Sequence, residues 1–179
     1  ALSRIAVCLS IPVLLLNASC SLPTFRSISI KKAAEAMAHY NRGRAFLEDA
    51  RRAPPHQRKY DKAIGEFNLA LHIDPGYAEA YRARGYVHYC AGRNNLAIDD
   101  YSQAIIREPG NTRGYYFRGW AYAYSRKFDK AIDDYNRVIK LKPRHAGAWY
   151  NRGLAYRHLG KKIRSEADLD KARELGFKD

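Results

Sequence analysis

The chain has 179 residues, of which 32 are Lys or Arg and 18 are Asp or Glu, so its formal net charge is +14. Its 14 tyrosines argue against an extended disordered chain, because disordered segments are poor in aromatic residues. The three cysteines, Cys8, Cys20 and Cys90, cannot assemble a disulfide framework or a zinc site of paired cysteines.

The N-terminal segment differs in composition from the rest of the chain. Residues 1–32 contain no Asp or Glu, and the stretch from Ile5 to Leu16 is mostly apolar. This run is well short of the ~20 residues that a helix needs to cross a bilayer. Arg4 and the apolar run favour a secretory signal, so we assign residues 1–32 to a targeting segment. The alternatives are an uncleaved anchor and an organelle transit peptide.

Cys20 follows the string Leu16, Asn17, Ala18, Ser19. Small residues before a cysteine resemble the lipobox of bacterial lipoproteins, in which the cysteine becomes the acylated N-terminus. Asn17 stands where that motif usually has Leu. The resemblance implies lipidation of Cys20 and a membrane anchor; the alternative is an ordinary thiol beside a signal or anchor.

From residue 33 onward the sequence repeats itself. Gly85, Gly119 and Gly153 are 34 residues apart, and small residues follow each glycine after 12 residues, at Ala97, Ala131 and Ser165. An earlier unit contains Gly43 and Ala63, with a spacing of 20 residues that includes an insertion. Prolines close three of the units, at Pro75, Pro109 and Pro143.

This pattern resembles the tetratricopeptide repeat (TPR), a 34-residue unit of two helices. The resemblance implies an all-α fold, a right-handed superhelical solenoid of stacked antiparallel helix pairs. It places repeats near 36–77, 78–111, 112–145 and 146–177 within a domain spanning 33–179. The insertion at 51–60 should form a basic loop, because Pro54 and Pro55 disfavour helix.

One departure from the family pattern is systematic. Arginine stands before each repeat glycine, where the family usually has Leu, at Arg42, Arg84, Arg118 and Arg152. An acidic residue lies 16 positions after three of them, at Asp100, Asp134 and Asp168, and Glu66 follows Arg42 across the insertion. We therefore expect Arg–carboxylate pairs within each repeat, bidentate where geometry allows. The glycines need a packing reason, since each costs ~1 kcal/mol in a helix. We expect Gly on the first helix and Ala or Ser on the second to let the two backbones pack tightly, with large residues filling the surrounding space.

No catalytic or cofactor motif is found. The six histidines show no paired metal-ligand spacing, and there is no phosphate-binding loop or nucleophile elbow. We expect a protein that is not an enzyme and that uses no metal or cofactor.

TPR proteins usually bind ligands on the concave surface formed by the first helix of each repeat. The resemblance places the peptide-binding residues at Tyr40, Asn41, Arg44, Arg82, Tyr86, Tyr89, Arg113, Tyr116, Phe117, Trp120, Tyr150 and Asn151. Tyr, Trp and Arg dominate binding hot spots, so we expect a peptide or protein partner that is acidic and has apolar anchors. Tyr40 and Arg44 replace the Lys and Asn of the family's carboxylate clamp, which makes a chaperone C-terminus a doubtful ligand.

Two functions remain open at this stage. The first is a protein-interaction module or scaffold that is exported, periplasmic or membrane-anchored, or cytoplasmic if residues 1–32 are not a signal. The second is a basic protein that binds single-stranded nucleic acid, because residues 33–179 contain 28 of the basic residues and all 18 acidic ones. Arginines interleaved with aromatic residues suit stacking on single strands.

Overall fold

The computed structural model describes residues 22–54 and 58–178, which form eight helices and no strand. The helices are α1 (Leu22–Arg52), α2 (Asp61–Ile73), α3 (Ala78–Cys90), α4 (Asn94–Arg107), α5 (Thr112–Tyr124), α6 (Phe128–Leu141), α7 (Ala146–His158) and α8 (Lys162–Glu174).

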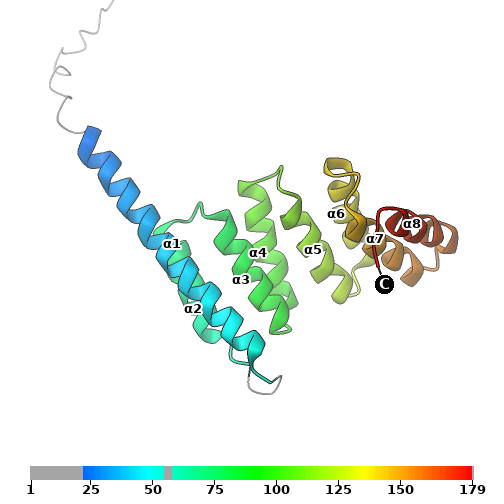
Figure 1. The fold of residues 1–179 in the computed structure, drawn as a ribbon, viewed down its shortest axis with the longest axis horizontal. Helices are drawn as coiled ribbons and strands as arrows, with labels where there is room; N and C mark the ends of the chain where they lie inside the picture. Colours follow the sequence, from blue (N-terminus) through cyan, green and yellow to red (C-terminus); the bar gives the residue numbers. More distant parts are fainter. Residues whose placement is uncertain (1–21, 55–57, 179) are drawn as a thin grey trace, which may run out of the picture.

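The helices stack as four antiparallel pairs in chain order (Figure 1). Each odd-numbered helix packs against the next even-numbered one, and each pair packs against the following pair. In addition α1 contacts α3, α3 contacts α5, and α5 contacts α7, so the odd-numbered helices form one continuous surface. The expected all-α solenoid of stacked helix pairs is confirmed.

Helix α1 is the longest element and extends past the rest of the solenoid (Figure 1). It begins at Leu22, well before residue 36, and continues without a break across the expected boundary at residue 33. From residue 27 onward, where its side chains are described, Ile28 is 56% exposed and Ile30 is 61% exposed, and the first buried side chain is Ala36. Burial against the solenoid therefore starts where the repeat pattern starts.

The insertion separates α1 from α2. Helix α1 ends at Arg52, just before Pro54, and α2 begins at Asp61. This agrees with the expectation that the two prolines disfavour helix, although residues 55–57 lie outside the described part of the chain.

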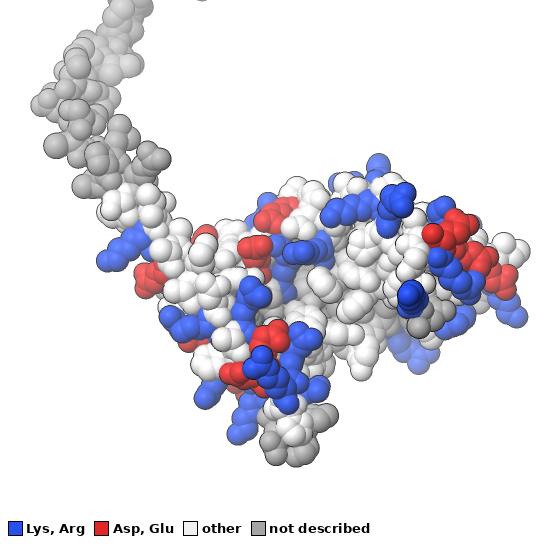
Figure 2. All heavy atoms as spheres, in the orientation of Figure 1, with Lys and Arg blue, Asp and Glu red and all other residues white. Residues whose placement is uncertain are grey.

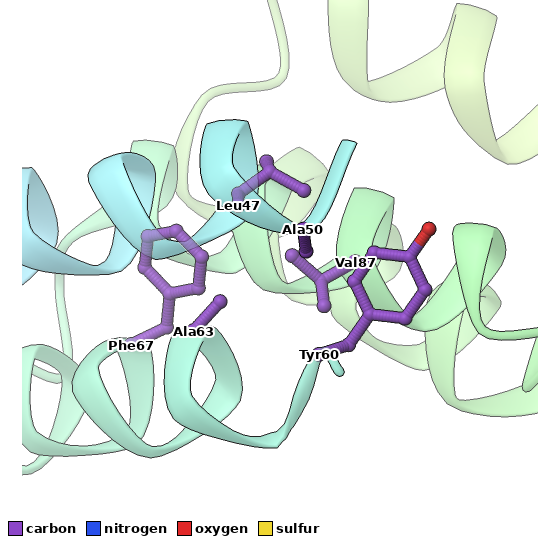
Figure 3. Close-up of a cluster of buried hydrophobic side chains, with 6 residues drawn as sticks. All are labelled: Leu47, Ala50, Tyr60, Ala63, Phe67 and Val87. Atoms are coloured by element: carbon purple, nitrogen blue, oxygen red, sulfur yellow. The ribbon is translucent and has the colours of Figure 1, made fainter. Parts of the chain in front are cut away.

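The first pair shows how the core is built (Figure 3). Side chains of α1 and α2 meet between the helices, and Val87 of α3 joins them from the next pair. A single core is thus shared between neighbouring repeats, which is why the units stabilise each other. The buried cluster consists of Leu47, Ala50, Tyr60, Ala63, Phe67 and Val87.

The repeat glycines make room for large side chains. A Cβ atom added at Gly119 would lie 2.7 Å from the ring of Tyr135, and one at Gly43 would lie 2.7 Å from the ring of Phe67. Tyr101 and Leu169 occupy the same place beside Gly85 and Gly153. The atoms nearest to the missing Cβ belong to the large residue that follows the small Ala or Ser of the second helix by four positions.

The expected Arg–carboxylate pairs are present in every repeat. In three repeats the guanidinium donates two hydrogen bonds to one carboxylate, at 2.6–2.9 Å. In the first repeat Arg42 donates a single bond of 3.0 Å to Glu66. The bidentate pairs are Arg84 with Asp100, Arg118 with Asp134, and Arg152 with Asp168.

Each bidentate arginine also reaches the preceding repeat. Arg84 donates to the Oδ1 atom of Asn68, and Arg118 donates to the hydroxyl of Ser102. Arg152 donates to Asn136 in the same way. These contacts join each pair of helices to the one before it, a role that the sequence pattern did not reveal.

Candidate binding groove

Two hollows lie side by side on the surface of the odd-numbered helices. The first, which we call the basic cleft, has a volume of about 580 Å³ and lies between α1, α3 and α5. The second, which we call the aromatic pocket, has a volume of about 330 Å³ and lies between α3, α5, α6 and α7. The basic cleft is lined by Tyr40, Arg44, Leu47, Arg51, Glu79, Arg82, Ala83, Tyr86, Arg113 and Phe117. The aromatic pocket is lined by Tyr89, Trp120, Ala123, Tyr124, Phe128, Tyr135, Asn151, Leu154, Ala155 and His158.

The basic cleft has an excess of positive charge. Four arginines and one glutamate line it. Arg44 and Arg113 are exposed and make no ion pair with any residue that the structure describes. Their guanidinium groups are therefore available to an anionic ligand, and arginine binds carboxylates well because its donors match both oxygens.

The other two arginines of the cleft are already paired. Arg82 lies 2.5 Å from Glu108 and 3.4 Å from Glu79, and Arg51 lies 3.2 Å from Glu48. Burial raises the pKa of Glu108, but hydrogen bonds from Arg82 and from the neighbouring asparagine outweigh it, so the pKa is lowered. The glutamate thus stays ionised and fixes the position of Arg82. Lys and Arg are also prominent on the wider surface seen in Figure 2.

The floor of the basic cleft is apolar and aromatic. The rings of Tyr86 and Phe117 lie 6.3 Å apart, centre to centre, and Tyr40 packs against Phe67 below it. Burial raises the pKa of the Tyr86 phenol, so this side chain stays neutral. A ligand in the cleft would therefore meet arginine at the walls and aromatic rings at the base.

The aromatic pocket is built from rings that fix one another. Tyr89 lies 6.3 Å from Trp120 and meets Tyr124 edge to face at 5.7 Å. Phe128 and His158 stack in parallel, with ring centres 4.6 Å apart. Among the described residues that line this pocket, none is Lys, Arg, Asp or Glu.

The two hollows meet on α5. Phe117 lines the basic cleft and Trp120 lines the aromatic pocket, and their rings are in edge-to-face contact at 5.6 Å. A bound peptide that lies along the surface can pass from one hollow to the other over these two rings.

Nine of the twelve residues expected to bind peptide line one of the hollows. Six line the basic cleft, namely Tyr40, Arg44, Arg82, Tyr86, Arg113 and Phe117. Three line the aromatic pocket, namely Tyr89, Trp120 and Asn151. Asn41 is exposed on α1 and lines neither hollow. Tyr116 on α5 and Tyr150 on α7 are half-buried and also line neither hollow. Cys20, the expected lipidation site, lies outside the described residues.

Tyr116 and Tyr150 each pack against the last residue of their own repeat. Tyr116 packs on His145 with ring centres 4.6 Å apart and accepts a hydrogen bond of 3.1 Å from Asn151. Tyr150 stacks on Phe177 at 4.2 Å. Tyr40 likewise contacts Tyr77 at 5.1 Å. In these three repeats the side chain at this position therefore packs against the last residue of its own repeat, and only in part faces a ligand.

Several residues of the two hollows were missed at the sequence level. The resemblance places groove residues at the fifth, sixth and ninth positions of a repeat, and in some repeats at the second and twelfth. Leu154 and Ala123 stand at the ninth and twelfth positions of their repeats, so the family pattern could have identified both. Arg51 lies beyond the positions that the pattern assigns to the groove, and the same is true of Tyr124, Phe128 and His158. These four required the packing of neighbouring helices to be known.

The described residues contain no cluster of three or more His, Cys, Asp or Glu that could hold a metal ion. None of the described helices is long and apolar enough to cross a membrane.

Comparison with solved structures shows the same architecture elsewhere. A crystal structure of MamA shares 24% identity with this chain at a TM-score of 0.71, covering 86% of this chain and 85% of that one. MamA residues 41 to the end from Desulfovibrio magneticus RS-1 share 21% identity at a TM-score of 0.67, covering 78% and 75%. The first TPR of Spaghetti (RPAP3), bound to the HSP90 peptide SRMEEVD, shares 21% identity at a TM-score of 0.65, covering 72% and 95%.

No curated protein matches the chain. The sequence profile of the tetratricopeptide repeat matches residues 56–112 and 116–176, which together make up more than half of it. The repeated glycines, the four helix pairs and this match establish that the chain belongs to the tetratricopeptide repeat family.

Proposed function

We propose that this protein is a non-catalytic interaction module that holds an acidic segment of a partner polypeptide in the basic cleft. The observation that carries the proposal is the pair of exposed arginines, Arg44 and Arg113, which lack acidic partners among the described residues and flank an aromatic floor. An acidic peptide would supply the missing carboxylates, and its backbone and apolar atoms would cover the rings.

The structural relatives support a peptide ligand of this kind. The HSP90 peptide bound to the Spaghetti TPR has the sequence SRMEEVD, which carries three acidic side chains. In the present chain Tyr40 and Arg44 replace the Lys and Asn of the family's carboxylate clamp, so the acidic peptide would be held by different residues. We therefore assign the ligand by its charge and leave its protein of origin open.

A direct binding measurement tests this proposal. A fluorescein-labelled peptide with several glutamates is titrated with the wild-type protein and with the double variant Arg44→Glu/Arg113→Glu, and anisotropy is recorded. The matched control is Lys140→Glu/Lys162→Glu, which makes the same change in net charge at exposed positions outside both hollows. The proposal predicts at least tenfold weaker binding for the arginine variant only. Equal loss in both variants would show that the peptide responds to net charge and not to the cleft.

We further propose that residues 1–32 export the protein and that Cys20 is lipidated, which would hold the module at a membrane. The apolar run before Cys20 and the absence of acidic residues there support this. Labelled fatty acid should be incorporated into the wild-type protein and not into Cys20→Ser, and the protein should fractionate with membranes. Incorporation that persists in the variant would rule out this site.

Nucleic-acid binding is kept as the second candidate because Trp120 and Tyr89 form an aromatic surface beside the basic cleft of a strongly basic chain. Stacking on such rings is worth ~1–3 kcal/mol per base, so true binding of a single strand should weaken in Trp120→Ala. Binding of single-stranded RNA at physiological salt that depends on Trp120 would favour this candidate. Association that is lost at physiological salt would reflect charge alone.

A further inference from the structure

We propose that the aromatic pocket is a second subsite of the same groove, which takes one large apolar side chain of the bound acidic peptide. We further propose that this side chain follows, at a distance of three residues, the acidic residue that meets Arg113. This inference rests on the proposed function, because it assumes that an acidic peptide occupies the basic cleft.

The lining of the aromatic pocket determines what it can accept. Its walls are the rings of Tyr89, Trp120, Tyr124 and Phe128, and Leu154 contributes a further apolar surface. A charged side chain would lose its hydration here without gaining an oppositely charged partner, since none of the described lining residues is Lys, Arg, Asp or Glu. A leucine, methionine or phenylalanine side chain would instead bury apolar surface against the rings.

A cationic ligand, which aromatic rings can also bind, is disfavoured by the surroundings. Arg113 and Arg44 have no acidic partner among the described residues of the adjacent cleft, and the chain as a whole carries a net charge of +14. A lysine or quaternary ammonium group would approach this surface against repulsion. The favoured occupant is therefore a neutral side chain on a peptide whose acidic residue is attracted by the cleft.

The pocket is already formed in the folded chain. Phe128 is held by its parallel stack on His158, and Tyr89 is held between Trp120 and Tyr124. Tyr135 and Ala155, which also line the pocket, are almost fully buried. Because little has to be ordered when a side chain enters, burial of its apolar surface contributes directly to affinity.

Helix α5 sets the spacing between the two subsites. Arg113 lines the basic cleft, and Trp120, seven residues further along the same helix, lines the aromatic pocket. At 1.5 Å per residue these two positions are roughly 10 Å apart along the helix axis. A peptide in the polyproline II conformation repeats its side-chain direction every third residue, with a rise of about 9 Å. An acidic residue and an apolar residue three positions later would thus face Arg113 and Trp120 together.

A series of synthetic peptides tests both the pocket and the spacing. Each peptide has two consecutive glutamates in a glycine and serine background, and a single leucine is placed one, three, five or seven residues after the second glutamate. A further peptide has no leucine. Binding is followed by the fluorescence of Trp120 in the Trp149→Phe background, which leaves one tryptophan, and by anisotropy of the labelled peptides.

The peptide with leucine at the third position should bind about tenfold more tightly than the peptide without leucine, and it should shift the emission of Trp120. In Ala123→Phe, where a new ring fills the pocket, that advantage should disappear while the leucine-free peptide binds as before. The matched control is Ala167→Phe, because Ala167 is exposed on α8 and lines neither hollow.

The failure of this inference can be told apart from the failure of the proposed function. If all peptides bind with equal affinity and this binding requires Arg44 and Arg113, the proposed binding in the basic cleft is confirmed and the proposed apolar subsite is wrong. If the optimum lies at the seventh position, the peptide binds as a helix and the three-residue spacing is wrong. If no peptide binds at millimolar concentration, both proposals are overturned. The peptide series on the otherwise unaltered protein gives these results even if the pocket-filling variant fails to fold.

Discussion

Arg118 donates hydrogen bonds to both carboxylate oxygens of Asp134, from Nε at 2.9 Å and from Nη2 at 2.7 Å. This ion pair joins α5 to α6 within the third helix pair. A further hydrogen bond of 3.0 Å from Arg118 to Ser102 joins the third helix pair to the second. The hydrogen bonds with Asp134 raise the pKa of the guanidinium, so it stays charged although it is half-buried. Because the same arrangement occurs in three repeats, these arginines hold neighbouring helix pairs together along the solenoid.

Removing this arginine should be costly. Arg118→Ala leaves Asp134, which is 5% exposed, as a buried carboxylate without its partner. Losing one member of a buried pair typically destabilises a protein by about 3–5 kcal/mol. Arg42→Ala is the comparison, because Arg42 is half-exposed and makes one bond to Glu66, so its loss should cost about 1 kcal/mol or less. Urea denaturation of both variants measures the difference, and equal losses would contradict the role given to the bidentate pair.

The repeat glycines should differ sharply from a glycine elsewhere in a helix. In Gly119→Ala the new methyl group would lie 2.7 Å from the buried ring of Tyr135, so we expect a loss of about 1–3 kcal/mol from overpacking. Gly65 lies within α2 with nothing within 4 Å of its missing Cβ, so Gly65→Ala should stabilise the protein by up to about 1 kcal/mol. Thermal denaturation compares the two, and a tolerated Gly119→Ala would argue against close packing at this position.

His88 should make stability depend on pH. Burial lowers the pKa of this histidine, and its Nδ1 atom has no hydrogen-bond partner among the described residues. In the unfolded chain the ring binds a proton near pH 6.5, whereas in the fold it does so only at lower pH. The unfolded state thus binds more protons below about pH 6.5, and the free energy of unfolding falls as the pH falls through that range.

The other repeats supply a replacement for this residue. Tyrosine stands at the equivalent positions 122 and 156, so His88→Tyr should fit the fold and reduce the loss of stability between pH 7.5 and pH 5.5. Burial lowers the pKa of His145 as well, so part of the dependence should remain. Urea denaturation at both pH values checks this, and an unchanged pH dependence in the variant would mean that His88 does not cause it.

Phe177 should hold α8 against α7 through its stack on Tyr150. Its ring stacks on Tyr150 at 4.2 Å, and its backbone N–H donates to the carbonyl of Ala172 at 3.0 Å. In Phe177→Ala the amides of α7 and α8 should exchange hydrogen faster than in the wild-type protein, while α3 and α4 stay protected. The control is Ile163→Ala on α8, since Ile163 is 85% exposed. Equal exchange in both variants would show that the stack does not hold the end of the solenoid.

The sequence predicted those features of the fold that recur with a fixed spacing. Arg118 and Asp134 could be paired in advance because they lie 16 residues apart in a unit that repeats, and two helices joined by a short turn bring such positions together. The early start of α1 at Leu22 carried no such signal, because residues 27–35 are exposed and belong to no repeat.

The groove was less predictable for a related reason. The family pattern identifies positions on the first helix of each repeat, and so it found Arg113 and Trp120. It does not encode what the next segment places beside those positions, such as His145 against Tyr116 or Phe177 against Tyr150. These contacts depend on loop and terminal residues that differ from one repeat to the next.

The central claim is that a peptide binds to the odd-numbered helices and not elsewhere on this basic chain. Backbone amide NMR spectra recorded with and without the glutamate-rich peptide that carries leucine at the third position test it most directly. The account predicts that the perturbed amides cluster around Arg44, Arg113 and Trp120 on α1 and α5, and extend to Leu154 on α7. Perturbations concentrated on α2, α4, α6 and α8, or spread over all basic residues, would contradict it.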